Sequence, residues 1–360
     1  MITKLSLQNF TVFEQLELSF SPGLNVIVGE NGAGKTHLLK LSYSLSNGWT
    51  GLKEEPNFSK ERVGNYFASR LRHVFKVDKI GHLTRLESNG KTGVSVLNNP
   101  ILSINKPNVM DQVDWAFHFS NRSQEKINMD DFGIELENNN SCGKSLYFPA
   151  KEVLSLFEGL LALYAKREIS LDETFHDLAL HLSTPKLKVK PPLIDRALVS
   201  LIDDVGGTLE LDGGKFYLVT KGKKRQEISL VAEGIRKLAT LIHLIENGSL
   251  EQGDTLFWDE PESNLNPKLI KNIAAVLLFL ANNGIQVVIA THSLFLLREL
   301  EILSALTEYK SVPQRYFALE KCETSVKAHQ GACIDDIDPL VMLDEDLHQA
   351  DRFMSIVEEL

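Results

Sequence analysis

Eight residues near the start of the chain read Gly29-Glu30-Asn31-Gly32-Ala33-Gly34-Lys35-Thr36. The apolar run Val26–Val28 before them predicts a buried strand, and the unbroken run from Thr36 to Leu41 predicts a helix. A strand, a glycine-rich loop and a helix in this order are typical of a phosphate-binding loop. The sequence therefore predicts a nucleotide-binding fold of the α/β class.

Each part of this loop has an expected contact with ATP. Backbone N–H groups would surround the phosphates, Lys35 would meet the β and γ oxygens, and Thr36 would ligate Mg²⁺. Glycines let the backbone approach the phosphates closely. ATP and Mg²⁺ are the predicted cofactors, and the predicted nucleotide-binding residues are Gly29, Glu30, Asn31, Gly32, Ala33, Gly34, Lys35, Thr36 and His37.

A second motif follows the apolar run Thr255–Trp258, which predicts a strand ending at Asp259 and Glu260. Parallel sheets present ligand-binding groups at the carboxyl ends of their strands. We expect Asp259 to hold Mg²⁺ through water, and Glu260 to be the catalytic group that polarises the attacking water. Glu262 fits a turn or a helix start as well as a functional role.

A histidine follows another predicted strand, Gln286–Ala290, in the sequence Thr291-His292-Ser293. This strand comes one predicted helix after the acidic strand. The strand-end position favours His292 as a catalytic residue that senses the γ-phosphate. A purely structural histidine is the alternative.

The rest of the pattern predicts a mixed sheet with flanking helices. Alternating apolar residues up to Phe20 indicate an antiparallel N-terminal hairpin, and residues 234–290 alternate between helix and strand patterns. Residues 51–145 are weakly patterned and are interpreted as an inserted subdomain. A helical run is expected from Val153 to Tyr164, with two strands and a final helix after Arg315.

Together these motifs resemble the ATPase head of the ABC class, a P-loop NTPase, in the branch of RecF, SMC proteins and OLD nucleases. The resemblance covers residues 1–45 and 146–300. It divides the chain into an N-terminal part of the head (1–50), the inserted subdomain (51–145), the remainder of the head with a helical segment at 153–204 (146–310), and a C-terminal extension (311–360). The motifs that carry it are Leu7-Gln8-Asn9-Phe10, Gly23–Gly32, Asp259–Leu265 and Thr291–Ser293.

Heads of this kind dimerise around two ATP molecules, each held between one subunit's phosphate loop and the other subunit's signature helix. The matching segment here is Leu230–Lys237, whose helix would direct its positive N-terminal end at the partner's γ-phosphate. Its sequence departs from the usual signature, since an alanine replaces a serine and a glutamate replaces a glycine. An ordinary helix start is the alternative. The residues assigned to the signature are Ala232, Glu233, Gly234 and Lys237.

The loop that supplies a metal-binding glutamine in such heads matches Pro149–Glu152, which contains no glutamine. Lys151 or Glu152 could replace it, although a helix-start charge is an equal reading. The resemblance therefore gives Thr36, Asp259 and Glu152 as the predicted metal ligands.

Composition limits the classes of function. A net charge of −10 argues against a protein that coats nucleic acid over its whole surface. Two basic clusters, Lys186–Lys190 and Lys221–Arg225, leave local DNA contact open, with solvated turns as the alternative. With no apolar run long enough for a membrane span and no secretory signal, a cytoplasmic protein without a membrane partner is expected.

The resemblance implies an ATPase, slow or stimulated by a partner, that acts as a switch in phage defence or DNA repair. Its expected partners are a second copy of itself in an ATP-dependent homodimer, a separate effector protein, and DNA. In the OLD branch a nuclease domain follows the head, but the residues after His292 are too few for one. The alternatives are an ABC transporter-type ATPase subunit and a binding module that holds ATP without hydrolysis.

Overall fold

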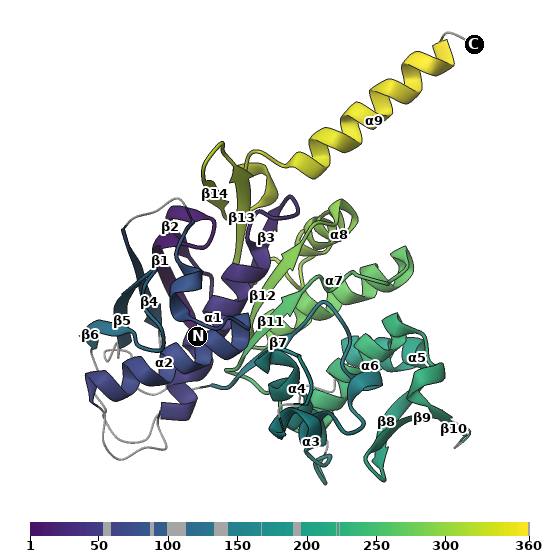
Figure 1. Cartoon of the computed structure of the whole chain (residues 1–360). Helices are drawn as coiled ribbons and strands as arrows, with labels where there is room; N and C mark the ends of the chain where they lie inside the picture. The colour runs from purple at the N-terminus through teal and green to yellow at the C-terminus, as the bar shows by residue number, and fades with distance from the viewer. Residues whose placement is uncertain are drawn as a thin grey trace.

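The computed structural model describes residues 1–52, 59–86, 90–98, 113–132, 143–166, 168–189, 196–220, 222 and 224–358. Figure 1 shows a body built around a central sheet, with one helix, α9 (Val341–Glu358), projecting away from it. None of the described helices is long and apolar enough to cross a membrane.

The central sheet has six strands in the order β14-β13-β3-β12-β11-β7. All neighbouring pairs are parallel except β13 and β14 at one edge. The carboxyl ends of the parallel strands therefore meet at one edge, where α/β proteins bind ligands. The strands are β3 (Leu24–Gly29), β7 (Ser145–Phe148), β11 (Thr255–Asp259), β12 (Gln286–Thr291), β13 (Gln314–Lys321) and β14 (Val326–Gly331).

A second, antiparallel sheet has the order β2-β1-β4-β5-β6. The predicted N-terminal hairpin is confirmed, because Leu5 pairs with Leu18 and Leu7 with Leu16. The segment interpreted as an inserted subdomain supplies β4, β5 and β6, so its described strands share a sheet with the hairpin. The strands are β1 (Ile2–Phe10), β2 (Phe13–Ser19), β4 (Lys91–Asn98), β5 (Val113–Ser120) and β6 (Asn128–Phe132).

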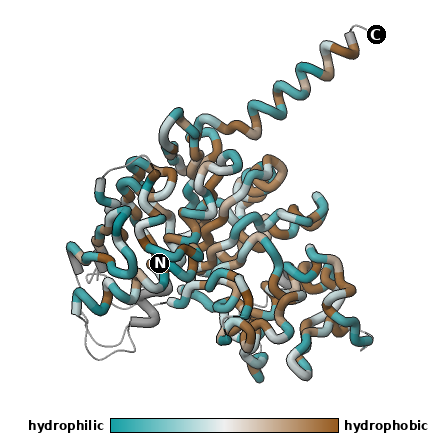
Figure 2. Tube along the Cα trace, in the orientation of Figure 1, coloured by the Kyte–Doolittle hydropathy of each residue, from teal (hydrophilic) through white to brown (hydrophobic). Residues whose placement is uncertain are grey.

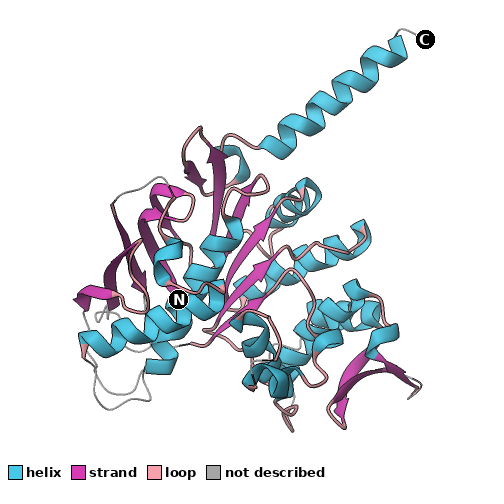
Figure 3. Cartoon of the chain, in the orientation of Figure 1, coloured by secondary structure: helices cyan, strands magenta, loops and turns pink. Residues whose placement is uncertain are grey.

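Helices cover both faces of the central sheet (Figure 3). The expected run from Val153 to Tyr164 is not one helix, because Gly159 interrupts it with a left-handed φ of 73°.

A small third sheet contains β8 (Gly207–Asp212), β9 (Lys215–Thr220) and β10 (Arg225–Glu227). The other described helices are α1 (Lys35–Leu52), α2 (Lys60–Phe75), α3 (Leu160–Ala165), α4 (Glu173–Ser183), α5 (Arg196–Val205), α6 (Glu233–Glu246), α7 (Pro267–Asn282) and α8 (Leu294–Ser304), with short 3₁₀ turns at Ile80–Leu83, Leu154–Leu156, Ile228–Leu230 and Ile334–Asp336.

The central sheet separates two hydrophobic cores. Val26 and Val28 of β3 belong to the core shared with α4, α6 and α7, whereas Ile27 faces the core shared with α1, α2 and the N-terminal sheet. Alternate side chains of a strand point to opposite faces, so a strand buried on both faces is apolar throughout. Figure 2 shows this concentration of apolar residues along the central strands. The fold thus holds the carboxyl edge of the sheet rigidly between two packed layers.

Candidate functional site

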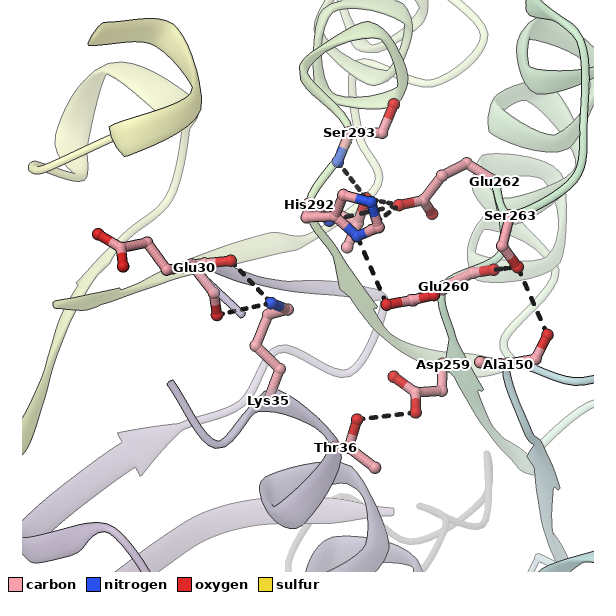
Figure 4. Close-up of polar contacts among 12 residues, drawn as sticks. Glu30, Lys35, Thr36, Ala150, Asp259, Glu260, Glu262, Ser263, His292 and Ser293 are labelled. Atoms are coloured by element: carbon pink, nitrogen blue, oxygen red, sulfur yellow. Dashed lines mark hydrogen bonds and ion pairs between the residues drawn. The ribbon is translucent and has the colours of Figure 1, made fainter. Parts of the chain in front are cut away.

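The glycine-rich stretch forms a loop between β3, which ends at Gly29, and α1, which begins at Lys35. The Lys35 ammonium donates hydrogen bonds to the carbonyl oxygens of Gly29, at 2.7 Å, and Glu30, at 3.0 Å (Figure 4). Burial lowers the pKa of this ammonium, and the nearby carboxylates of Glu260 and Asp259 oppose the shift. The loop thus holds a buried cation at its centre, which suits an anionic ligand.

Gly34 must be glycine for two reasons. Its φ is 90°, in the left-handed region that favours glycine. A Cβ there would also lie 2.6 Å from Cζ of Phe13 and 2.7 Å from Cγ2 of Val12. The phosphate loop therefore packs directly on the turn between β1 and β2, which fixes its position.

Thr36 and Asp259 meet although they belong to different motifs. The Thr36 hydroxyl donates to Oδ2 of Asp259 at 2.8 Å, and the Tyr147 hydroxyl lies 3.5 Å from the same oxygen. Oδ1 of Asp259 is buried and has no hydrogen-bond partner among the described residues. Burial raises the pKa of this carboxyl group, while the hydrogen bond from Thr36 opposes the shift. A buried carboxylate oxygen without a partner, beside a hydroxyl, fits a Mg²⁺ site of the predicted kind.

Glu260 has an unusual backbone conformation, with a φ of 48°. Its N–H donates to the carbonyl oxygen of Ala290 at 2.9 Å, and its own carbonyl oxygen accepts from the Ser263 hydroxyl at 2.9 Å. Left-handed backbone at a residue other than glycine is costly and recurs at functional sites. Oε1 of Glu260 lies 3.5 Å from Nδ1 of His292, so the structure brings the two predicted catalytic residues together (Figure 4).

Glu262 connects the ends of β11 and β12. Its buried Oε1 accepts a hydrogen bond from the Thr291 hydroxyl at 2.6 Å and one from the His292 N–H at 3.3 Å. From the sequence alone, Glu262 could have been a turn residue, a helix-start residue or a functional residue. Its position two residues after Glu260, in the same acidic motif, was the available signal.

Lys35, Thr36 and Glu260 border one hollow of 260 Å³. The predicted residues do not all face it. Ala33 is fully buried in the core, and the Glu30 carboxylate pairs with Lys321 of β13 at 3.4 Å. The lining residues are Asn31, Gly32, Gly34, Lys35, Thr36, His37 and Glu260.

Lys321 was not predicted from the sequence. It contacts the carbonyl oxygen of Asn31 as well as the Glu30 carboxylate. Because β13 pairs with β3 in parallel, the end of β13 lies beside the phosphate loop. The predicted phosphate loop thus has a second ammonium group beside it, placed by a strand far away in sequence.

The predicted signature segment begins helix α6, with Ala232 as an N-cap that makes no side-chain capping bond. Oε1 of Glu233 accepts a hydrogen bond from Nδ2 of Asn264 at 2.8 Å. A Cβ at Gly234 would lie 2.5 Å from Cδ2 of Leu265 and 2.8 Å from the carbonyl oxygen of Asn264. Gly234 therefore serves a close contact within its own chain, whatever it does for a partner.

Lys237 and Glu152 are engaged inside the chain. The Lys237 ammonium, whose pKa is lowered by burial, bonds to the hydroxyl and the carbonyl oxygen of Ser263. The Glu152 carboxylate pairs with Arg236 at 2.9 Å and accepts bonds from Ser155. These contacts join the loop after β7 to α6 and to the loop after β11. A metal-binding role for Glu152 stays a prediction.

The fold and this arrangement of motifs define a P-loop protein of the ABC-ATPase type. Two family models match the chain, one described as an AAA domain over residues 4–144, and one described as an AAA domain, putative AbiEii toxin, Type IV TA system, over residues 130–298. These matches support the predicted resemblance to ABC-type ATPase heads of the RecF/SMC branch.

Two curated RecF proteins are similar to a short part of the chain. The DNA replication and repair protein RecF of Bacillus mycoides (strain KBAB4) is 49% identical over 45 residues. The RecF protein of Cytophaga hutchinsonii is 54% identical over 44 residues. Each match covers 12% of this chain and only 12% of the relative's length.

Solved structures of SMC heads share the fold over nearly the whole chain. An SMC head bound to the C-terminal winged-helix domain of ScpA is 14% identical, with a TM-score of 0.56 over 93% of this chain and 98% of that one. An SMC head with an extended coiled coil, bound to the C-terminal domain of ScpA derived from Pyrococcus furiosus, is 12% identical, with a TM-score of 0.53 over 99% of both chains. The predicted fold class is confirmed.

Proposed function

We propose that the chain is an ATP-hydrolysing switch that dimerises on Mg-ATP. The single observation that carries this proposal is the convergence of Thr36, Asp259, Glu260 and His292 at the carboxyl edge of the sheet, next to Lys35. They lie at or shortly after the ends of three separate strands, and two of them, Thr36 and Glu260, line one hollow. A site for a bound anion alone would not need the acidic pair.

Hydrolysis requires that a water oxygen attack the γ-phosphorus while the bond to the bridging oxygen breaks and ADP leaves. In the proposed mechanism, Lys35 and the loop N–H groups bind the phosphates, and Glu260 accepts the proton of the attacking water. Thr36 and Asp259 would hold Mg²⁺, which would neutralise phosphate charge. His292, kept in place by Glu262, would contact the γ-phosphate.

Dimerisation would use the surface that α6 shares with the loop after β11. Ala232 leaves the first N–H groups of α6 without a side-chain cap, so a phosphate of the partner's nucleotide could accept from them. Leu230, just before this helix, is 73% exposed, and a dimer interface would bury this apolar side chain. The switch would then act on a separate effector protein or on DNA, in phage defence or DNA repair.

Two variants test the site. Lys35→Ala should abolish ATP binding, because it removes the buried cation of the loop. Glu260→Gln should retain ATP affinity but lose about a hundredfold or more of its turnover, since an amide cannot accept the proton. Calorimetry of ATP binding and phosphate-release kinetics measure the two effects.

Glu301→Gln, on the exposed side of α8, is the matched control and should behave as the wild type. Normal turnover in Glu260→Gln would place the base elsewhere. Tight ATP binding with no turnover in the wild type would support the non-hydrolysing module instead.

A further inference from the structure

Helix α9 leaves the body of the protein after a short anchored base. Leu340 is buried, and Met342 and Leu343 pack against the core that contains α8. Arg298 of α8 forms an ion pair with Asp346 at 3.2 Å. Every described side chain from Asp344 to Val357 is exposed, and Figure 1 shows the helix extending away from the other elements.

An apolar stripe begins at Leu343, in the anchored base, and continues along the exposed part of α9. Its members are spaced four, three, four and three residues apart, which places them on one face of a helix. Leu347 and Met354 are 54% and 56% exposed, although both are large apolar residues. Apolar and polar residues alternate along α9 in Figure 2. The stripe consists of Leu343, Leu347, Ala350, Met354 and Val357.

An isolated helix in water gains little stability unless its apolar face packs against another surface. We therefore expect this stripe to be buried against such a surface. Acidic residues border the stripe on both sides: Asp344 and Asp351 lie along one edge, and the other edge carries Asp346 together with the exposed Phe353. The single arginine of the helix, Arg352, lies on the opposite face.

A second copy of α9 fits this stripe poorly. When two such helices pack stripe to stripe, the residues at the edges of one helix approach those of the other. Asp346 of one copy would then lie near Asp351 of the other in a parallel pair, and acidic edges would also meet in an antiparallel pair. Like charges at these positions are destabilising. The charge pattern therefore favours a partner with basic edges.

We propose that α9 docks in an apolar groove rimmed by lysine or arginine on a different protein. The stripe supplies the buried contact, and the acidic edges pair with the basic rim, as in helix-in-groove recognition. The surface lies outside the nucleotide site, so the inference does not depend on ATP hydrolysis.

The test uses the full chain and two labelled helical peptides with the same leucine stripe, one flanked by lysine and the other by glutamate. Fluorescence anisotropy without nucleotide should show saturable binding of the lysine peptide, and at least about tenfold weaker binding of the glutamate peptide. Leu347→Glu with Met354→Glu should weaken binding of the lysine peptide by at least about tenfold. Ile356→Glu is the control, because Ile356 is 60% exposed but lies away from the stripe.

Light scattering of the wild type, without peptide and nucleotide, completes the test. We expect it to match the mass of the double variant. The proposal is overturned if the lysine peptide does not bind, if both peptides bind equally, or if Ile356→Glu loses as much affinity as the double variant. A wild-type oligomer that the double variant cannot form would overturn it as well, because a second copy would then be the occupant.

Discussion

Glu262 is a buried carboxylate that holds His292, the predicted γ-phosphate sensor, in place. Its Oε1 bonds to Thr291 and to the backbone of His292, and it lies 3.7 Å from Nδ1 of His292. The other oxygen, Oε2, is buried without a described partner. The His292 ring is therefore held from two sides, by Glu260 and by Glu262.

Glu262→Ala should lower kcat for ATP by about tenfold or more, because His292 loses its support. The KM for ATP should change little, since Lys35 and the phosphate loop are untouched. Steady-state phosphate release measures both parameters, with Glu301→Ala as the control for losing an acidic side chain. An equal loss in KM and kcat would mean that Glu262 serves binding or folding and not positioning.

Asp254 makes the folding stability of the chain depend on pH. Burial raises the pKa of its carboxyl group from 3.8 to about 6, although N–H groups of Lys144 and Glu251 donate to it at 2.7 and 2.8 Å. Because the pKa is raised on folding, the protonated form stabilises the fold. This stability is complete below the unfolded pKa and is lost as pH rises through about 6.

Between pH 4 and pH 7 the wild type should lose about 2 kcal/mol of unfolding free energy relative to Asp254→Asn, which cannot ionise. Urea titrations at several pH values measure the difference between the two proteins. Glu251→Gln, in the same turn but exposed, should follow the wild type. Parallel pH profiles for the wild type and Asp254→Asn would contradict the assignment.

Among the elements, α4 is tied to both α1 and α2 by buried polar groups. The Tyr43 hydroxyl of α1 donates to Asp177 at 2.6 Å, and Arg70 of α2 pairs with Asp177 at 2.6 Å and with Glu173 at 3.0 Å. Lys40 pairs with Asp172, the N-cap of α4, at 2.8 Å. The helix that follows the phosphate loop is thereby linked to the helical segment on the other side of the sheet.

Arg70→Met should destabilise the protein by about 3 kcal/mol, because the partly buried carboxylates of Asp177 and Glu173 lose their buried cation. Arg72→Met is the matched control on the same helix. Its partner Glu125 is mostly exposed, so we expect a loss below about 1 kcal/mol. Denaturant unfolding measures the loss of unfolding free energy in the two variants. Similar losses would show that the ion pairs of Arg70 contribute no more to stability than the exposed ion pair of Arg72.

Periodicity predicted the strands and helices next to the phosphate-loop and acidic motifs well. A strand buried on both faces is apolar throughout, and a glycine-rich loop between a strand and a helix is a clear signal. The elements around Lys35, Asp259 and His292 follow from these local signals. The contacts of Lys237, Lys321 and Glu262 could not be predicted, since they depend on how distant segments pack. The pairing of β4, β5 and β6 into one sheet with the first strands likewise depends on contacts that no local pattern encodes.

At the scale of the whole molecule, the proposed dimer predicts a nucleotide-dependent change in mass. Glu260→Gln should be monomeric alone and dimeric with Mg-ATP in light scattering, because bound ATP would persist between the two heads. Leu230→Asp in that background should weaken the ATP-dependent dimer by placing a charge at the start of α6.

Leu180→Asp is the control for that change, since Leu180 is an exposed leucine on α4. Gly234 is unsuitable for the test, because any side chain there would collide with Asn264 and Leu265 of its own chain. A molecular mass of Glu260→Gln that does not change when Mg-ATP is added would contradict the proposed switch.

The order of strands in the central sheet also has a consequence during synthesis on the ribosome. β3 is translated early, yet both of its neighbours, β12 and β13, emerge only after most of the chain has been made. The N-terminal antiparallel sheet can assemble long before that. Until translation passes residue 291, the apolar strand that leads into the phosphate loop has no neighbouring strand to join, and non-local pairing of this kind is slow. The nascent chain should therefore depend on chaperones up to that point, and it should acquire the ability to bind nucleotide in a single late step.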